Sequence, residues 1–398
     1  MRTRPALPVR RLAFSVLIVT MSTQPVFVLG ASFFQIGPEL GLGPAGLGFL
    51  TAAFFLTAAA ASPAMGRWVQ RVGWRRAARV NVFGSGLVMV GIAALGRASW
   101  SMGALLVGAA AIYGLANPAA NAALAEVSTA GRRATLFGIK HAGIPGSTMV
   151  AGALVPVVVV VHGWRWAMVA GAGLALVVRA VMPPESGAGP TDVGPDDEPP
   201  AGELSTGYLV GLGLASALAT WAATGLGSFL VSASLARGID ESAAGLLLTA
   251  GSLASIVARV VVGRVTDRRS LRATTGLTTL MATGAIVFWL LPAASGGVYF
   301  ALILVAFMTG WAWPGLMTYA VVNANRASVA ASSAITQAGV FLGAGVGPFV
   351  LGQIAEHWSY DAMWVAVGVA LAAAASGVWT VRLLRAGARS TAGRQSDR

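Results

Sequence analysis

The amino-acid sequence predicts an all-α integral membrane protein with twelve transmembrane helices, arranged as two pseudo-symmetric six-helix bundles. Three observations predict this: a composition poor in charge, a series of long apolar runs, and an internal repeat. Of the 398 residues, 56% are hydrophobic and 10% are charged, whereas a soluble domain carries about 25% charged residues. So little charge cannot cover the surface of a water-soluble fold of this length.

The apolar runs are long enough to cross a bilayer, since a transmembrane helix needs about 20 apolar residues. The first run follows four arginines and is too long for the apolar part of a signal peptide, so we expect it to be retained as a helix. The predicted spans are 12–34, 45–65, 78–96, 101–125, 135–161, 164–182, 205–233, 243–263, 273–292, 297–322, 330–353 and 361–384.

The basic residues are distributed unevenly between the two sides of these spans. With the N-terminus inside, 22 of the 27 lie on the cytoplasmic side, and only Arg97, Arg165 and Arg237 lie on the other. This is the positive-inside rule. It accounts for the net charge of +13 without a nucleic-acid partner. It also predicts a multi-pass protein of the cytoplasmic (plasma) membrane, in contact with the lipid bilayer and with both termini cytoplasmic.

The chain divides at an acidic segment between the sixth and seventh runs. Residues 184–204 are rich in Pro and Gly and contain six acidic and no basic residues, a composition that cannot bury apolar area. We therefore expect a first half at 1–183, a flexible cytoplasmic linker at 184–204, a second half at 205–386 and a disordered basic tail at 387–398.

Several kinds of chemistry lack the residues that they need. The chain has no cysteine and only three histidines, which are too far apart in sequence for a local metal motif. No Gly-x-x-x-x-Gly-Lys-Ser/Thr loop is present, so ATP hydrolysis cannot power the protein. We expect no metal, no cofactor and no enzymatic activity.

The two halves match at an offset of about 196 residues. Gly114 and Pro118 correspond to Gly310 and Pro314, and the run Ile139–Gly143 corresponds to Ile335–Gly339. Basic segments that begin at Gly66 and Gly263 follow spans two and eight. Two parallel six-helix halves are the architecture that encloses a site at the membrane midplane and rocks around it.

At these basic segments the chain resembles the major facilitator superfamily of secondary transporters. In that family, the sequence motif after span two is roughly Gly-x-x-x-Asp-Arg-x-Gly-x-Arg-Arg. This chain has Gln70 at the position of the aspartate. The copy after span eight keeps the acid as Asp267 but has Ser270 in place of the second glycine. The resemblance implies that these are cytoplasmic gating loops: Gly66, Gln70, Arg71, Gly73, Arg75 and Arg76, and Gly263, Asp267, Arg268 and Arg272.

Two further residues extend this predicted gate. Glu126, at the cytoplasmic end of span four, is expected to pair with arginines of the 66–76 segment. Arg259 is expected to pair with Asp267 or another acceptor at the inner face.

The resemblance also implies which helices line the substrate cavity: the first, fourth, seventh and tenth. This nominates Gln24, Tyr113, Asn117, Trp221, Trp311 and Trp313, with Gln337 added as the repeat counterpart of His141. Polar and aromatic groups around an apolar pocket suit a small-molecule site. Ordinary helix packing is the alternative for each of them.

Lys140 and His141 lie inside span five, where a charge is costly and tends to face a cavity or a partner. Lys140 either lines the cavity and binds an anionic group, extends back to the cytoplasmic interface, or pairs with an acid that the sequence does not identify. His141 either carries protons in the cavity or packs between helices, and neighbouring helical residues do not share a face.

None of the fourteen carboxylates lies in the middle of a predicted span, which favours an anionic or neutral substrate over a cationic drug. The leading hypothesis is a transporter that works by alternating access on a small organic anion, coupled to protons or to exchange, and acts as a monomer. The alternative is a proton-coupled efflux pump for hydrophobic drugs or metabolites. The tryptophans of spans seven and ten support it, but the expected Gly-Pro-x-x-Gly-Gly signature is replaced by Gly143-Ile144-Pro145-Gly146.

The topology is testable because the chain has no native cysteine. In intact cells, cysteines introduced by Gly194→Cys and Ser390→Cys should resist a membrane-impermeant thiol reagent, and one introduced by Gly238→Cys should react. Labelling of the Gly194→Cys protein from outside the cell would reverse the predicted orientation.

Overall fold

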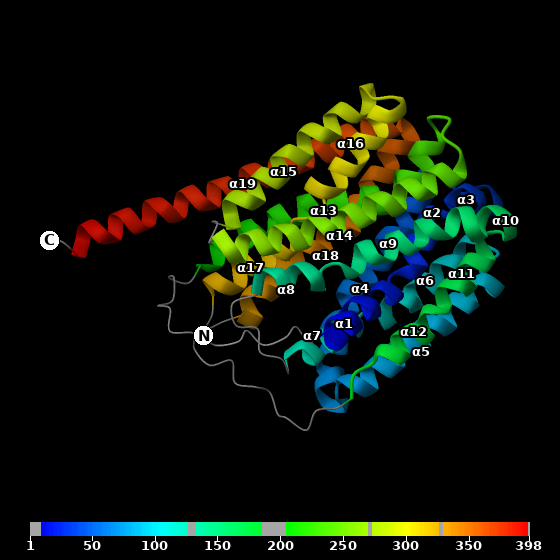
Figure 1. Ribbon diagram of the computed structural model, residues 1–398, viewed down its shortest axis with the longest axis horizontal. Coiled ribbons are helices and arrows are strands. Elements are labelled where there is room, and N and C mark those ends of the chain that lie inside the picture. The colour runs from blue at the N-terminus through cyan, green and yellow to red at the C-terminus, as the bar shows by residue number, and fades with distance from the viewer. Residues whose placement is uncertain (1–8, 126–132, 185–203, 270–272, 326–328, 397–398) are drawn as a thin grey trace.

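A computed structural model describes residues 9–125, 133–184, 204–269, 273–325 and 329–396. Within these ranges the regular structure is entirely helical, and the helices form one elongated bundle (Figure 1). Eleven helical segments are long and apolar enough to cross a membrane, and the bent pair α1 and α2 makes a twelfth. The twelve predicted spans are therefore confirmed for the described residues.

The first six spans comprise helices α1 to α12. Span one is α1 and α2, span two α4, span three α5, span four α6 and α7, span five α8 to α10, and span six α11 and α12. Their bounds are α1 Val9–Ser22, α2 Gln24–Ala31, α3 Phe33–Leu40, α4 Pro44–Val72, α5 Trp74–Leu95, α6 Ser99–Tyr113, α7 Ala116–Ala125, α8 Arg133–Lys140, α9 Gly143–Leu154, a π-helical turn Val155–Val159, α10 Val160–His162, α11 Trp164–Ala172 and α12 Leu174–Val181.

The last six spans comprise helices α13 to α19. Spans seven, eight and nine are α13, α14 and α15, span ten is α16 and α17, and spans eleven and twelve are α18 and α19. Their bounds are α13 Thr206–Leu235, α14 Glu241–Arg269, α15 Ala273–Leu290, a 3-10 turn Leu291–Ala293, α16 Gly296–Thr309, α17 Pro314–Ala324, α18 Val329–His357 and α19 Tyr360–Ser396. Helix α19 continues into the tail that the sequence predicts to be disordered, where alanine and arginine favour helix.

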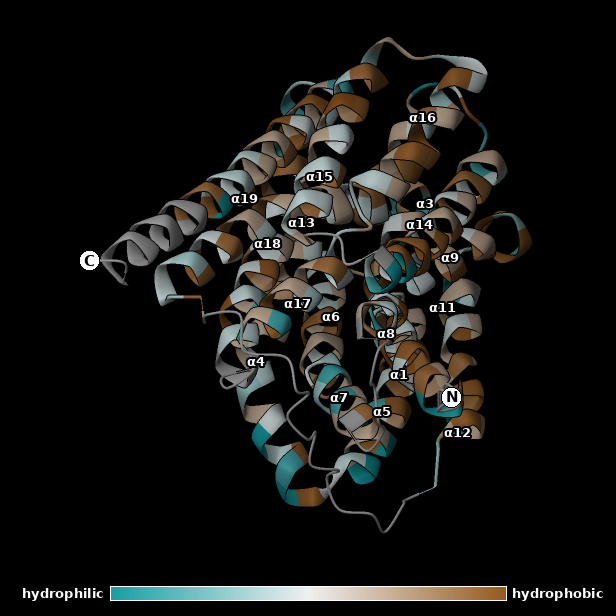
Figure 2. Cartoon of the chain, turned by 60° about the vertical axis from the view of Figure 1, so that its left-hand side comes forward, coloured by the Kyte–Doolittle hydropathy of each residue, from teal (hydrophilic) through white to brown (hydrophobic). Residues whose placement is uncertain are grey.

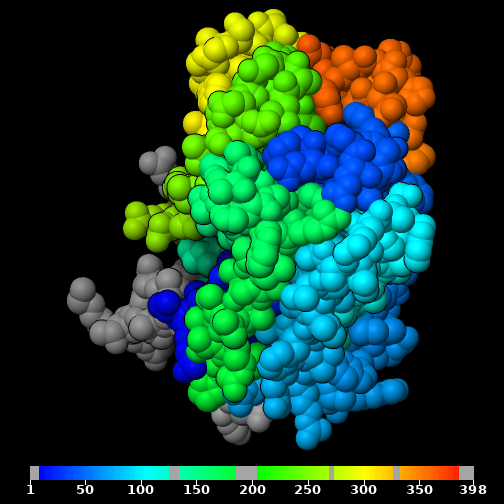
Figure 3. All heavy atoms as spheres, turned by 90° about the vertical axis from the view of Figure 1, so that its right-hand side faces the viewer, coloured from blue at the N-terminus to red at the C-terminus, as the bar shows by residue number. Residues whose placement is uncertain are grey.

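We call the end of the bundle that holds the start of α1 and the end of α12 the proximal end. The Arg10 side chain joins these two segments, because it donates to the carbonyls of Val181 and Met182 at 3.3 and 2.9 Å. The distal end holds the turns between α3 and α4 and between α13 and α14. Figure 3 shows that blue and cyan residues of the first half and yellow and orange residues of the second half occupy opposite parts of the molecule.

At the distal end, each half is closed by an ion pair of opposite polarity. In the first half, Glu39 accepts hydrogen bonds from the Arg165 guanidinium and from the Trp164 indole. In the second half, the acid is Asp361 and the base is Arg237. Arg165 and Asp361 open spans six and twelve at the repeat offset, so the repeat conserves the pairing but exchanges the charges. The hydrogen bond from Arg165 lowers the pKa of Glu39 below its ordinary value.

The two halves meet along the full length of spans five and eight. A Cβ atom added to Gly152 would lie 2.6 Å from the Gly245 carbonyl near the distal end, and one added to Gly263 would lie 2.8 Å from the Ala134 carbonyl near the proximal end. Glycine therefore allows the backbones to touch at both ends of this interface.

Spans two and eleven meet in their distal part and toward their middle, where Gly345 packs on Leu56. Gly48 approaches the Pro348 carbonyl, and the Glu356 carboxylate accepts a hydrogen bond from the N–H of Ala45 at the start of α4 (3.1 Å). Nearer the proximal end, Gly339 and Gly343 of α18 pack instead on α13 of their own half. Phe55 and Ser62 of α4 and Gln337 and Phe341 of α18 line the central cavity.

Asp267 joins the halves in a way that the sequence did not predict. Its carboxylate accepts hydrogen bonds from the backbone N–H groups of Ala134 and Thr135 (3.0 and 2.9 Å) and from the Thr135 hydroxyl (2.5 Å). It therefore caps the N-terminus of α8, where the backbone donors have no partner within the helix and a negative charge is favoured. The expected pairing of Asp267 with Arg259 is replaced by this cap.

The segments expected to be gating loops are mostly helical. Gly66, Gln70 and Arg71 belong to the last turns of α4, and the chain turns at Gly73 alone, where φ is +83°. Hydrophilic residues gather at this end of α4 (Figure 2). Gly263 and Arg268 lie in α14 in the same way, while Glu126 and Arg272 lie outside the described residues.

The cap predicts a difference between the two basic segments. Asp267→Asn should destabilise the protein by about 1 kcal/mol and impair transport, because the amide cannot accept at both oxygens or oppose the helix dipole. Gln70→Ala should change neither property, since Gln70 is exposed and bonds to no described residue. Thermal unfolding and transport at matched expression measure both effects, and equal effects would show that the cap does not join the halves.

Candidate functional site

A cavity of about 260 Å³ lies between the two halves and receives side chains from eight of the twelve spans. Seven of the nine residues predicted for the cavity line it: Tyr113, Asn117, Lys140, His141, Trp311, Trp313 and Gln337. No carboxylate is among its described lining residues. Most of the predicted residues therefore reach the cavity, but the sequence did not show why they meet there.

The reason is a set of helix breaks, each four residues before a proline. A proline inside a helix removes an N–H donor and clashes with the carbonyl four residues earlier. Pro118 follows the break at Gly114, Pro145 follows the break at His141, and Pro314 follows the break at Gly310. Irregular backbone at membrane depth is tolerated where it lines a cavity or is buried in protein. All three breaks border this cavity.

Arg259 binds the carbonyl groups that two of these breaks release. Its side chain is 3% exposed. The guanidinium donates to the His141 carbonyl of span five (2.9 Å), to the Trp311 carbonyl of span ten and to the Ser255 hydroxyl (3.4 Å). Of the acceptors expected for Arg259, Asp267 is not the one that it binds, because carbonyls at the proline breaks accept its hydrogen bonds.

His141 forms a second bridge between the halves. Its Nε2 lies 3.0 Å from the Thr318 hydroxyl oxygen, and this hydroxyl is 3.0 Å from the Pro314 carbonyl, to which it donates. The hydroxyl then accepts from His141, so Nε2 carries the hydrogen. Lys140 and His141 both line the cavity, although the N–H of His141 still bonds to the Phe137 carbonyl (3.0 Å) as in a helix.

The Lys140 ammonium forms no hydrogen bond or ion pair with any residue that the structure describes. Two neutral donors in the cavity also have free hydrogens. The buried indole N–H of Trp313 has no acceptor within the described ranges, and the Tyr113 hydroxyl accepts from Asn117 (3.4 Å), which leaves its own hydrogen available. These groups can all donate to a bound ligand.

Two predicted residues lie outside the cavity. Gln24 is fully buried, and its amide donates to the Ser147 carbonyl (3.1 Å). It therefore joins spans one and five within the first half. The Trp221 ring packs against Gly347 of α18. In both cases, a side chain of a type that often binds ligands makes contacts between helices instead.

Sequence reasoning missed several lining residues, among them Phe27, Phe55, Ser62, Asn121, Thr318 and Phe341. Asn121 lies one helical turn after Asn117, so helical spacing on span four is a signal that could have found it. Phe55 and Phe341 belong to spans two and eleven, which the resemblance did not nominate, and nothing in their sequence context distinguishes them from core residues.

Comparisons with known proteins agree with this architecture. The sequence pattern of the family described as Major Facilitator Superfamily matches residues 12–210 and 212–397. The chain is similar to a solved structure titled as a bacterial homolog to the human lysosomal transporter Spinster, in an inward-facing and occupied conformation. The two are 17% identical over 95% of this chain and 98% of that chain, with a TM-score of 0.69. No protein with a curated description matches.

The role of Arg259 predicts a stability defect. In Arg259→Lys a single ammonium cannot replace the fork that spans the two carbonyls, and an unsatisfied buried carbonyl costs about 1–3 kcal/mol. We expect a clear loss of thermal stability in detergent. Arg264→Lys, an exposed position of the same helix, is the matched control, and equal melting of the two variants would contradict the role of Arg259.

Proposed function

Because this chain belongs to the Major Facilitator Superfamily, it is a secondary transporter and not an enzyme, and we propose that its substrate is a small organic anion. The observation that carries the proposal is the charge of the cavity. Lys140 and Arg259 both reach it, and its described lining contains no acid to neutralise either of them. Unpaired charge in a site shielded from water is costly, and an anionic substrate offsets that cost.

The hydrogen-bonding groups support the same substrate. Lys140 and the Trp313 indole can only donate, and both lack an acceptor among the described residues. A carboxylate can only accept and offers two oxygens. It complements this set of donors, whereas a cation or an ammonium group would add donors where acceptors are needed.

Coupling to protons or to exchange is part of the proposal. His141 is the one imidazole at the cavity among the described residues, and it bonds across the two halves. It can therefore exchange a proton while the halves move. Exchange is the other route, since a second anion can restore the neutralisation that the first one provided.

Efflux of hydrophobic compounds is the second candidate, and the aromatic lining of the cavity favours it. Phe27, Phe55 and Phe341 join the two tryptophans there. The charge argues against cationic compounds in particular. We further propose that the protein acts as a monomer in the cytoplasmic membrane, with both termini inside.

Lys140 tests the proposal. In a thermal-shift screen of the purified protein, organic acids should stabilise it, and sugars and cationic drugs should not, because a ligand stabilises the state that it binds. Lys140→Gln should weaken binding of the acids by roughly one to two decades, since a charge-assisted hydrogen bond contributes about 1.5–3 kcal/mol.

Two controls accompany this experiment. Lys140→Arg should retain part of the binding, because the charge survives in a different donor geometry. Arg179→Gln removes an equal charge at an exposed position and should leave binding intact. Wild-type acid binding by Lys140→Gln would overturn the proposal, as would stabilisation by cations alone.

A further inference from the structure

The cavity is polarised along the axis of the bundle. At about 1.5 Å per helical residue, Lys140 lies about 10 Å from the start of α8, and Thr318 lies about 9 Å from the end of α17. Thr224 lies about 27 Å from the start of α13, and Ala344 about 22 Å from the start of α18. Lys140 and the Thr318 hydroxyl therefore face the proximal part of the cavity, and the Thr224 hydroxyl and other side chains bound its distal part.

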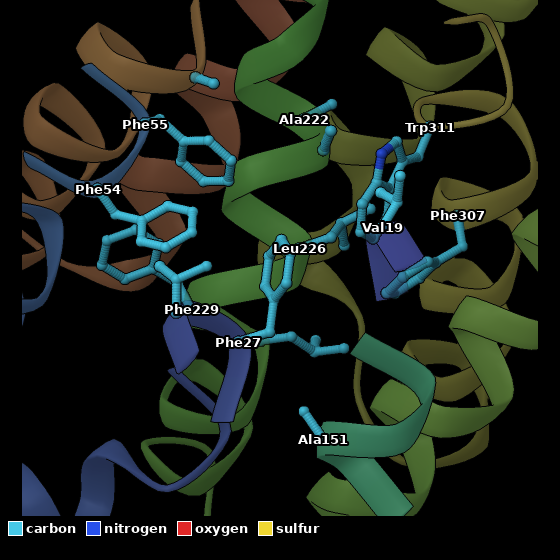
Figure 4. Close-up of a cluster of buried hydrophobic side chains, with 14 of the residues drawn as sticks. Val19, Phe27, Phe54, Phe55, Ala151, Ala222, Leu226, Phe229, Phe307 and Trp311 are labelled. Atoms are coloured by element: carbon cyan, nitrogen blue, oxygen red, sulfur yellow. The ribbon is translucent and has the colours of Figure 1, made fainter. Parts of the chain in front are cut away.

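Those distal side chains are mainly aromatic. The rings of Phe27 and Phe55 lie with their centroids 6.3 Å apart, and both line the cavity. Phe54 extends this group to Tyr113, with centroids 5.7 Å apart. Figure 4 shows the rings of Phe27, Phe54 and Phe55 beside Leu226, with Trp311 in the same cluster. Contacts with such rings favour an apolar or aromatic group.

The aromatic end of the cavity is closed behind these rings. A Cβ atom added to Gly30 would lie 2.8 Å from the Ser228 carbonyl, and one added to Gly227 would lie 2.7 Å from the Phe27 ring. The backbones of spans one and seven therefore meet there without room for a hydration shell. A charged group placed at this end would lose its water and find no cation.

The polar end offers one free positive charge among the described residues. Arg259 already donates to two carbonyls and a hydroxyl, which hold its guanidinium in place. Lys140 has no such partners. One carboxylate can therefore pair with Lys140 while Arg259 lies nearby, but a second carboxylate would have to enter the aromatic end unpaired.

We propose that the substrate is an amphipathic monocarboxylate with a hydrophobic or aromatic body. Its carboxylate binds at Lys140, and its body occupies the aromatic end between Phe27, Phe55 and Phe341. The inference rests on the proposed anion transport and narrows it, because it excludes hydrophilic dicarboxylates and tricarboxylates as preferred substrates. It also accounts for the joint presence of a free cation and an aromatic wall in one cavity.

Four matched probes separate charge from body: 2-naphthoate, 2-naphthalenemethanol, succinate and 2-naphthylmethylammonium. Binding to the purified protein is measured calorimetrically. We expect 2-naphthoate to bind at least about tenfold more tightly than the alcohol and the dicarboxylate, since each lacks one of the two interactions. In Lys140→Gln, 2-naphthoate and 2-naphthalenemethanol should bind about equally.

Aromatic variants test the other end of the site. Phe55→Ala should weaken 2-naphthoate by about tenfold. Phe49→Ala, on the same helix but 60% exposed, should not change it. If Phe55→Ala does not fold, Phe341→Ala tests the same wall from α18. Unchanged 2-naphthoate affinity in a folded variant of either position would overturn the inference.

The two proposals fail in different ways. Tighter binding of succinate than of 2-naphthoate, with dependence on Lys140, overturns the amphipathic substrate and leaves organic-anion transport standing. Preference for 2-naphthylmethylammonium overturns both. Absence of 2-naphthoate binding at millimolar concentration also overturns the amphipathic substrate, whatever other acids bind.

Discussion

The structure depends on how the backbone groups released at helix breaks are satisfied inside a membrane. Pro145 and Pro314 interrupt spans five and ten, and the carbonyls of His141 and Trp311 at these breaks would be costly to leave unpaired in a dry interior. The Arg259 guanidinium satisfies both carbonyls, because it donates a hydrogen bond to each of them. The same residue thereby links span eight to span five of the opposite half and to span ten of its own. Arg259 therefore stabilises the helix breaks and also holds the two halves in contact.

The contacts between the halves differ between the two sides of the interface. Spans five and eight touch at both ends, through Gly152 and Gly263, and the Asp267 cap adds a charged contact at the proximal end. Spans two and eleven touch distally, where Glu356 caps α4, and at Leu56 and Gly345. Any motion that opens the proximal side between spans five and eight must break the Asp267 cap and the bond from Arg259 to His141. Both are hydrogen-bonded contacts, and when they break, water can hydrogen-bond to the separated polar groups. Separated apolar surfaces gain no such replacement.

The sequence was sufficient for the architecture because hydropathy, the arginine asymmetry and the repeat all depend on the bilayer, which acts on every span alike. It was less informative for contacts. Asp267 is an acidic residue next to several arginines in the sequence, yet it caps α8. The free backbone N–H groups at a helix end are donors that the charges in the sequence do not reveal. Gln24 and Trp221 have suitable composition but pack between helices. The positions of Pro118, Pro145 and Pro314 were visible, and the breaks four residues before them followed from sterics alone.

The breaks also explain how a chain with so few charges can bring its intramembrane cations to one place. Lys140 and His141 are neighbours at the end of α8, and neighbouring helical side chains point about 100° apart. The N–H of His141 still bonds to the Phe137 carbonyl (3.0 Å), and both side chains line the cavity because it extends around the end of α8. Arg259 lies beside them because it donates a hydrogen bond to the His141 carbonyl, which the break in span five leaves without a helical partner. The break before Pro145 therefore leaves the His141 carbonyl free to bind Arg259, which lines the same cavity as Lys140.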